Sequence, residues 1–176
     1  MTRYPVAVIH GRFQPLHWGH LEYLLAGAER TDLLVVGITN PDPTLTTDEL
    51  ADLERGKPES NPFTYYERYL MVEGALREAG VSAERLRIVP FPHSYPERLR
   101  LYAPSDAIYL LTVYDQWGDV KVGRFRRLGL ATEVMWRRSD KPISGSRVRA
   151  AIAARHNWAE LVPPAVARVV KESGHA

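Results

Sequence analysis

The sequence predicts an α/β protein, a three-layer sandwich with helices on both faces of a five-stranded parallel sheet. Short, wholly apolar segments alternate along the chain with segments of helical spacing, which is the pattern of repeated strand–helix–strand units. Strands that are apolar on both sides are typical of parallel sheets, whose two faces are covered. A length of 176 residues fits one domain that spans residues 1–176.

Each element follows from its own local pattern. The expected strands are the apolar runs at 5–9, 32–39, 86–91, 107–114 and 132–136. The expected helices lie at 16–29, 64–79, 119–128, 144–155 and 164–172, with at most a short helix at 96–102. The helix from 64 begins with a capping-box pattern, Thr64 followed by Glu67, and ends before Gly80. The polar segment 40–62 is a long loop, which in a compact domain is usually functional or disordered.

The composition excludes several classes of protein. The chain has no cysteine, which excludes disulfide scaffolds, Cys-ligated zinc, iron–sulfur clusters and thiol catalysis. The net charge of +2 is too small for a general nucleic-acid or membrane-surface binder. No apolar stretch approaches the roughly 20 residues that span a bilayer, and the first apolar run is too short for a signal peptide. We therefore expect a cytoplasmic protein with no nucleic-acid or membrane partner.

The loop after the first strand lacks the common nucleotide and hydrolase motifs. It contains no G-x-G-x-x-G, and neither a P-loop nor a G-x-S-x-G elbow occurs anywhere in the chain. In open parallel sheets, ligands bind beyond the carboxyl ends of the strands, at the point where the strand order reverses. These absences disfavour nicotinamide dehydrogenases, P-loop kinases and α/β-hydrolases, although the site is still expected at this edge.

Residues 11–20 of that loop, GRFQPLHWGH, combine features of a phosphate site. His17 and His20 are three residues apart in the first helical turn, so both rings share one face. That turn offers unpaired backbone N–H groups and the positive end of the helix dipole, and Arg12 adds a fixed charge. Solvated or capping histidines and a partial metal site are the competing interpretations, but no third metal ligand lies nearby in the sequence. We favour a phosphate site with two titratable donors.

Three segments together carry a family resemblance. GRFQPLHWGH at 11–20 resembles the His-x-Gly-His signature of the nucleotidylyltransferase superfamily, in the longer form of the archaeal-type nicotinamide mononucleotide adenylyltransferases. ISGSRVR at 143–149 resembles the family motif that opens the helix after the fifth strand, and NPFT at 61–64 resembles the family stretch after the second strand. The resemblance implies a Rossmann-like sheet of order 3-2-1-4-5.

The second of these motifs also has a local interpretation. Ser144 and Ser146 are good N-cap residues, so this stretch can be a simple capped helix. Arg147 and Arg149 fall in the first turn, however, where cations oppose the helix dipole. A bound anion would remove that conflict, and we therefore favour phosphate binding at this turn.

The resemblance implies a nucleotidyltransferase that moves a nucleoside monophosphate group to a phosphate-bearing acceptor and releases pyrophosphate. Such chemistry needs positioning and charge neutralisation rather than a protein nucleophile. Mg²⁺ is expected to enter on the substrate phosphates, with no all-protein metal site. The implied catalytic residues are His17, His20 and Arg12, and the implied nucleotide-binding residues are Gly11, Phe13, Gln14, Arg138, Ile143, Ser144, Ser146 and Arg149.

The acceptor side departs from the family pattern. Residues 92–98, PHSYPER, lack the family's Trp, and residues 112–118, TVYDQWG, replace its Gly-Asn turn. Candidate acceptor-binding residues are Asn40, Tyr114, Asp115 and Trp117. We favour adenylyl transfer of the nicotinamide mononucleotide adenylyltransferase type. The alternatives are cytidylyl transfer from CTP to a small phosphate or phosphonate, and a nucleotide-binding regulator without turnover. The sequence allows a homo-oligomer without predicting one.

Overall fold

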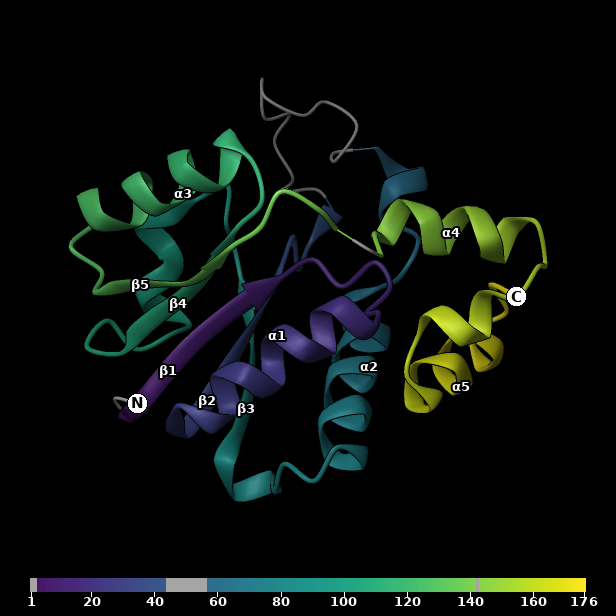
Figure 1. Cartoon of the computed structure of the whole chain (residues 1–176), viewed down its shortest axis with the longest axis horizontal. Coiled ribbons are helices and arrows are strands. Elements are labelled where there is room, and N and C mark those ends of the chain that lie inside the picture. The colour runs from purple at the N-terminus through teal and green to yellow at the C-terminus, as the bar shows by residue number, and fades with distance from the viewer. Residues whose placement is uncertain (1–2, 44–56, 142) are drawn as a thin grey trace.

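The computed structural model describes residues 3–43, 57–141 and 143–176. Five parallel strands form one sheet in the order β3-β2-β1-β4-β5, which confirms the expected sheet (Figure 1). The strands are β1 (Tyr4–Gly11), β2 (Thr31–Thr39), β3 (Leu86–Phe91), β4 (Ile108–Val113) and β5 (Thr132–Arg137). The central strand β1 pairs with β2 on one side and with β4 on the other, so the order reverses there. A crevice for ligands is therefore expected beyond Gly11.

The helices fall where apolar spacing predicts them, with shifted ends. They are α1 (Trp18–Glu29), α2 (Tyr65–Glu78), α3 (Gln116–Arg127), α4 (Gly145–Ala153) and α5 (Pro164–Glu172). The segment at 96–102 is a 3-10 helix, Pro96–Leu101, and others are Pro58–Ser60, Ala83–Arg85 and Trp158–Leu161. Helix α3 begins three residues earlier than expected, because the Asp115 carboxylate accepts a hydrogen bond from Gly118 N and caps it.

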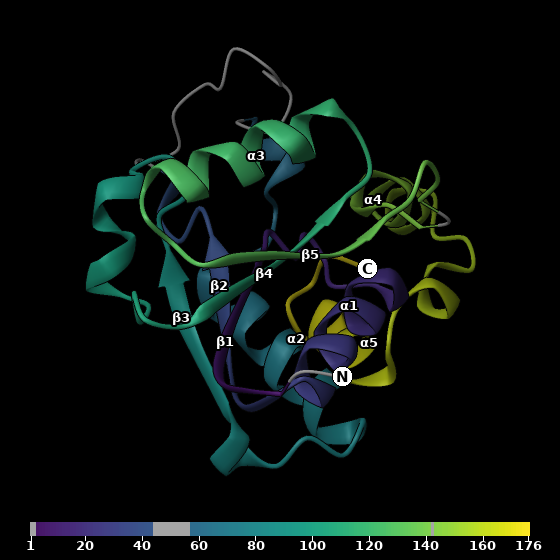
Figure 2. The same ribbon diagram turned by 60° about the vertical axis from the view of Figure 1, so that its left-hand side comes forward.

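Two hydrophobic cores lie on opposite faces of the sheet. One packs α1, α2, α4 and α5 against side chains such as Ile9 and Val36. The other packs α3 and the 3-10 helix Pro96–Leu101 against side chains such as Val8 and Tyr109. Figure 2 shows α3 on one face of the sheet, with α1, α2 and α5 on the other. This arrangement confirms the three-layer prediction.

The loop expected at 40–62 lies largely outside the described residues, which omit 44–56. Its first residue, Asn40, has a left-handed φ of 48°, a conformation that Asn tolerates better than most side chains. No helix in the described part of the chain is long and apolar enough to cross a membrane.

Candidate active site at the crossover of the sheet

The chain leaves β1 through a loop whose side chains turn inward. Phe13 has a left-handed φ of 51°, which is uncommon for a residue other than glycine, and its ring is fully buried. A Cβ atom on Gly11 would lie 2.7 Å from that ring, so the motif's first glycine makes room for Phe13. Of the predicted nucleotide-binding residues, Phe13 can therefore offer only its backbone to a ligand.

His17 and His20 form a reciprocal cap at the start of α1. His17 is the N-cap residue rather than part of the first turn, so the helix begins two residues later than predicted. His20 N donates to His17 Nδ1 at 3.3 Å, and His17 N donates to His20 Nδ1 at 3.4 Å. The two rings stack with centroids 3.7 Å apart. Because both Nδ1 atoms accept, the network assigns the proton of each neutral ring to Nε2.

Both histidines are neutral at pH 7 in the free protein. Burial lowers the pKa of His17 from 6.5 to about 4, and the nearby Lys141 ammonium lowers it further. The pKa of His20 is also lowered, first by burial and then by the charges of His17, Arg12 and Lys141. Each ring therefore offers one Nε2–H donor in a positively charged surrounding, instead of the titrating donors that the sequence suggested. Lys141 was not among the predicted residues, and its place just before the second motif is its only signal.

We expect the low pKa of His17 to make the protein less stable in acid. Between pH 4 and 6.5, the unfolded chain binds a proton at this position that the folded chain does not. The free energy of unfolding should therefore fall by up to about 3 kcal/mol as pH drops through this window. Urea denaturation at several pH values between 4 and 6.5 measures this change in the free energy of unfolding. His17→Asn keeps an N-cap acceptor but cannot titrate, so an equally steep loss in this variant would contradict the prediction.

The start of α4 lies against the first loop. Arg149 Nη1 donates to Gln14 O at 2.7 Å, and a Cβ on Gly145 would lie only 3.1 Å from that same carbonyl oxygen. Ser144 caps the helix by accepting from Arg147 N at 3.2 Å, and its hydroxyl lies 3.0 Å from that of Ser146. The structure thus brings the two predicted phosphate-binding turns side by side. Ile143 instead packs against the core of the α1 face.

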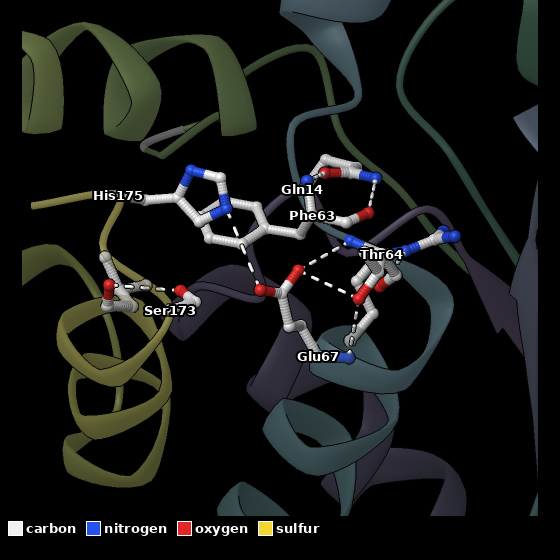
Figure 3. Close-up of polar contacts among 8 residues, drawn as sticks. Gln14, Phe63, Thr64, Glu67, Ser173 and His175 are labelled. Atoms are coloured by element: carbon white, nitrogen blue, oxygen red, sulfur yellow. Dashed lines mark hydrogen bonds and ion pairs between the residues drawn. The ribbon is translucent and has the colours of Figure 1, made fainter.

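Gln14 holds the third motif in place. Its side chain donates to Phe63 O at 2.8 Å and accepts from Phe63 N at 2.9 Å, so its amide is fully engaged in the interior (Figure 3). The Phe63 ring in turn meets the ring of His175 edge-on, with centroids 4.6 Å apart. The Gln14 side chain therefore supports the loop from behind, and only its carbonyl faces α4.

Arg68, on α2, is a second residue of this region that the sequence analysis did not predict. Its side chain is only 2% exposed. It donates to Arg12 O at 3.0 Å, Thr39 O at 2.6 Å and Asn40 O at 2.8 Å. One guanidinium therefore ties together the carboxyl ends of β1 and β2. The only sequence signal was its place shortly after the NPFT stretch.

The structure does not bring the four acceptor candidates together in one pocket. Tyr114 and Asp115 line an open cavity of about 310 Å³ with Val113, Asp119, Arg137, Arg138 and Ser139. Trp117 lies partly buried in the first turn of α3, and Asn40 lies at the end of β2. Lys141 sits over the Tyr114 ring at 4.8 Å, which links this cavity to the histidine pair. Arg138, predicted to bind nucleotide, pairs with Glu22 at 2.8 Å and lies over the Trp136 ring at 4.5 Å.

Metal ligands are scarce in this part of the molecule. Within residues 3–43, 57–141 and 143–176, no group of three or more His, Cys, Asp or Glu side chains is placed to hold a metal ion. The side chains around the loop, Arg12, His17, His20, Lys141 and Arg149, are instead basic or neutral donors. Such a surface fits an anionic ligand such as a phosphate chain.

Known proteins are similar to this chain in sequence. The chain is 75% identical over 167 residues to phosphonoformate cytidylyltransferase of Streptomyces viridochromogenes, covering 95% of this chain and 91% of that protein. It is 31% identical over 177 residues to nicotinamide-nucleotide adenylyltransferase of Pyrobaculum neutrophilum, covering 97% of this chain and 89% of that protein.

A similar fold occurs in a bifunctional NMN adenylyltransferase/ADP ribose pyrophosphatase from Francisella tularensis, with a TM-score of 0.68 and 16% identity. The match covers 96% of this chain but about half, 49%, of the Francisella chain. The Cytidylyltransferase-like family model matches residues 8–151, which include both histidines and the turn at the start of α4. The chain therefore belongs to the cytidylyltransferase-like family and is a nucleotidyltransferase.

Proposed function

We propose that this enzyme transfers the cytidylyl group of CTP to phosphonoformate, the smallest acid that carries both a phosphonate and a carboxylate. The observation that carries the proposal is the 75% identity to phosphonoformate cytidylyltransferase across 95% of the chain. The adenylyltransferase relatives, which match the first sequence expectation, are more distant at 27–31% identity. The cytidylyltransferase alternative therefore has the better support. A cytoplasmic location, where CTP is available, goes with this proposal.

The reaction balances without a protein nucleophile. A phosphonate oxygen of the acceptor attacks the α-phosphorus of CTP, and the bond from that phosphorus to the bridging oxygen of the β-phosphate breaks. Pyrophosphate leaves with the electron pair of the broken bond. Catalysis then consists of alignment and of stabilising negative charge on the triphosphate in the transition state.

The proposed roles follow from the donors of the site. The Nε2–H groups of His17 and His20 donate to the triphosphate, where added negative charge makes both hydrogen bonds stronger. Arg12 and Lys141 neutralise charge beside them, since both positive charges act on His20. Ser146, in the first turn of α4, and Arg149, at the start of its second turn, hold the outer phosphates at the positive end of the helix.

Mg²⁺ enters this scheme with the nucleotide, because it is commonly held by substrate phosphates and water rather than by a protein cage. Bound there, it would neutralise charge on the phosphates.

Pyrophosphate release measured with each pair of substrates tests the proposal. We expect kcat/KM with CTP and phosphonoformate to exceed that with ATP and nicotinamide mononucleotide by at least about 100-fold, the discrimination that one well-matched site provides. A preference for the second pair would support adenylyl transfer instead. Tight CTP binding with no pyrophosphate release from either pair would favour a regulator and overturn the proposal.

A further inference from the structure

His10 is a buried histidine that the proposed chemistry does not use. It is the penultimate residue of β1 and lies opposite Gly37 of β2. Its ring stacks on Phe91 at 4.8 Å between centroids and lies 5.2 Å from the Phe125 ring of α3. A Cβ on Gly37 would come within 2.5 Å of the Phe91 ring, so this glycine leaves the space in which Phe91 meets His10.

Both ring nitrogens of His10 lack a hydrogen-bond partner although they are buried. The side chain is only 7% exposed, and burial lowers its pKa well below 6.5. A neutral imidazole carries one donor and one acceptor, and native proteins rarely leave either unpaired. A phenylalanine would complete the same aromatic stack without this cost. The nitrogens therefore indicate a polar partner that the protein itself does not supply.

Among the described residues, two basic side chains lie near His10. After burial, the causes of its lowered pKa are the Lys121 ammonium and the His93 imidazole. His93 follows β3, and its ring is stacked 5.9 Å from that of His10. Lys121 comes from α3, on the same face of the sheet. Two stacked imidazoles, of His10 and His93, thus lie beside the crossover point, one residue before the loop that follows β1, with the Lys121 ammonium of α3 near enough to act on His10.

We propose that His10, His93 and Lys121 form the subsite for the acidic end of the acceptor. The inference rests on the proposed function, because the proposed function names phosphonoformate as the anion that these three residues would bind. Phosphonoformate carries negative charge at both ends, so its phosphonate can face the nucleotide while its carboxylate enters the basic cluster. Because the nitrogens of His10 are covered in the free protein, the residues over them shift on binding or a water molecule bridges the gap. Phe91 and Phe125 hold the imidazole in place.

Kinetics of His10→Phe test the assignment, because this variant keeps the aromatic stack and removes both nitrogens. We expect KM for phosphonoformate to rise at least tenfold, KM for CTP to change less than threefold, and Tm to stay equal or increase. Lys121→Met should raise the same KM at least fivefold. Arg127→Gln, an exposed cation at the end of the same helix, is the control and should change neither constant.

If His10 only fills space between Phe91 and Phe125, its replacement by phenylalanine should leave KM for phosphonoformate unchanged. If His10→Phe folds and both KM values stay within threefold of the wild type, the inference is overturned while the proposed function stands. If His10→Phe does not fold, Lys121→Met decides, and an unchanged KM for phosphonoformate overturns the inference.

A binding measurement separates this inference from the proposed reaction. Phosphonoformate added to the protein labelled with ¹⁵N-histidine should shift the ring resonances of His10 and His93, and should not shift that of the exposed His156. These shifts in a protein that does not turn over CTP would support the subsite and overturn the proposed function. Turnover with no shift of the His10 resonance, with CTP present or absent, would overturn the subsite alone.

Discussion

Replacing His20 with alanine is expected to lower kcat by 10²- to 10³-fold. This is the usual loss when one preorganised donor to a developing oxyanion is removed, equivalent to about 3–4 kcal/mol. His20 has a second role, since its Nδ1 accepts from His17 N and fixes the neighbouring ring. The variant therefore loses one donor and loosens the other. Single-turnover measurements with saturating nucleotide report the chemical step directly.

The control for this variant is His156→Ala, which removes an exposed imidazole beyond the end of α4. It should retain wild-type kcat. A loss of less than about tenfold in His20→Ala, in a protein whose far-UV spectrum is unchanged, would contradict the role assigned to His20.

Replacing Arg68 with methionine is expected to cost about 3 kcal/mol of stability and much of the activity. The guanidinium satisfies backbone carbonyls of Arg12, Thr39 and Asn40, and methionine fills a similar volume without any donor. Removing one partner of a buried, hydrogen-bonded charge leaves the other groups unpaired, which is among the more costly single changes. The loop after β1 then loses the hydrogen bond from Arg68 that holds the Arg12 carbonyl in place. Urea denaturation measures the free energy of unfolding. The KM for nucleotide shows whether the loop after β1 still binds its ligand.

Arg85→Met separates the two effects. Arg85 also donates to backbone carbonyls, those of Ala28 and Thr31, but at the opposite edge of the sheet. We expect it to lower stability while KM for nucleotide stays unchanged. Equal KM values in the two variants would show that Arg68 supports only the fold and would contradict its role in the site.

The sheet could be predicted because its evidence is local. Buried strands such as 32–39 are continuous apolar runs, and the connections between them have helical spacing. Helix ends were less predictable. The capping box at Thr64 is a sequence pattern and was placed correctly, with Glu67 N donating to Thr64 Oγ1 at 3.2 Å. His17 as an N-cap, with His20 in the Glu position of the box, is not a usual pattern, so α1 was placed two residues too early.

The directions of side chains could not be predicted from the motif. Gln14 and Phe13 look like ligand contacts in the sequence, but the left-handed backbone at Phe13 turns both toward the interior. Such a conformation in a bulky residue depends on tertiary packing rather than on local preference. The same holds for Arg68 and His10, whose contacts come from strands and helices distant in the chain.

The reciprocal cap of α1 has a consequence for how related sequences are interpreted. In the proposed mechanism, the pair of imidazoles that caps the beginning of α1 also binds the triphosphate, so losing either ring is expected to lower both stability and turnover. Selection for a stable chain alone can therefore preserve the pair after catalysis has been abandoned. If the proposed roles hold, the two histidines in a distant homologue indicate an intact helix start, whereas donors outside the cap, such as Lys141, are the better indication of an active enzyme.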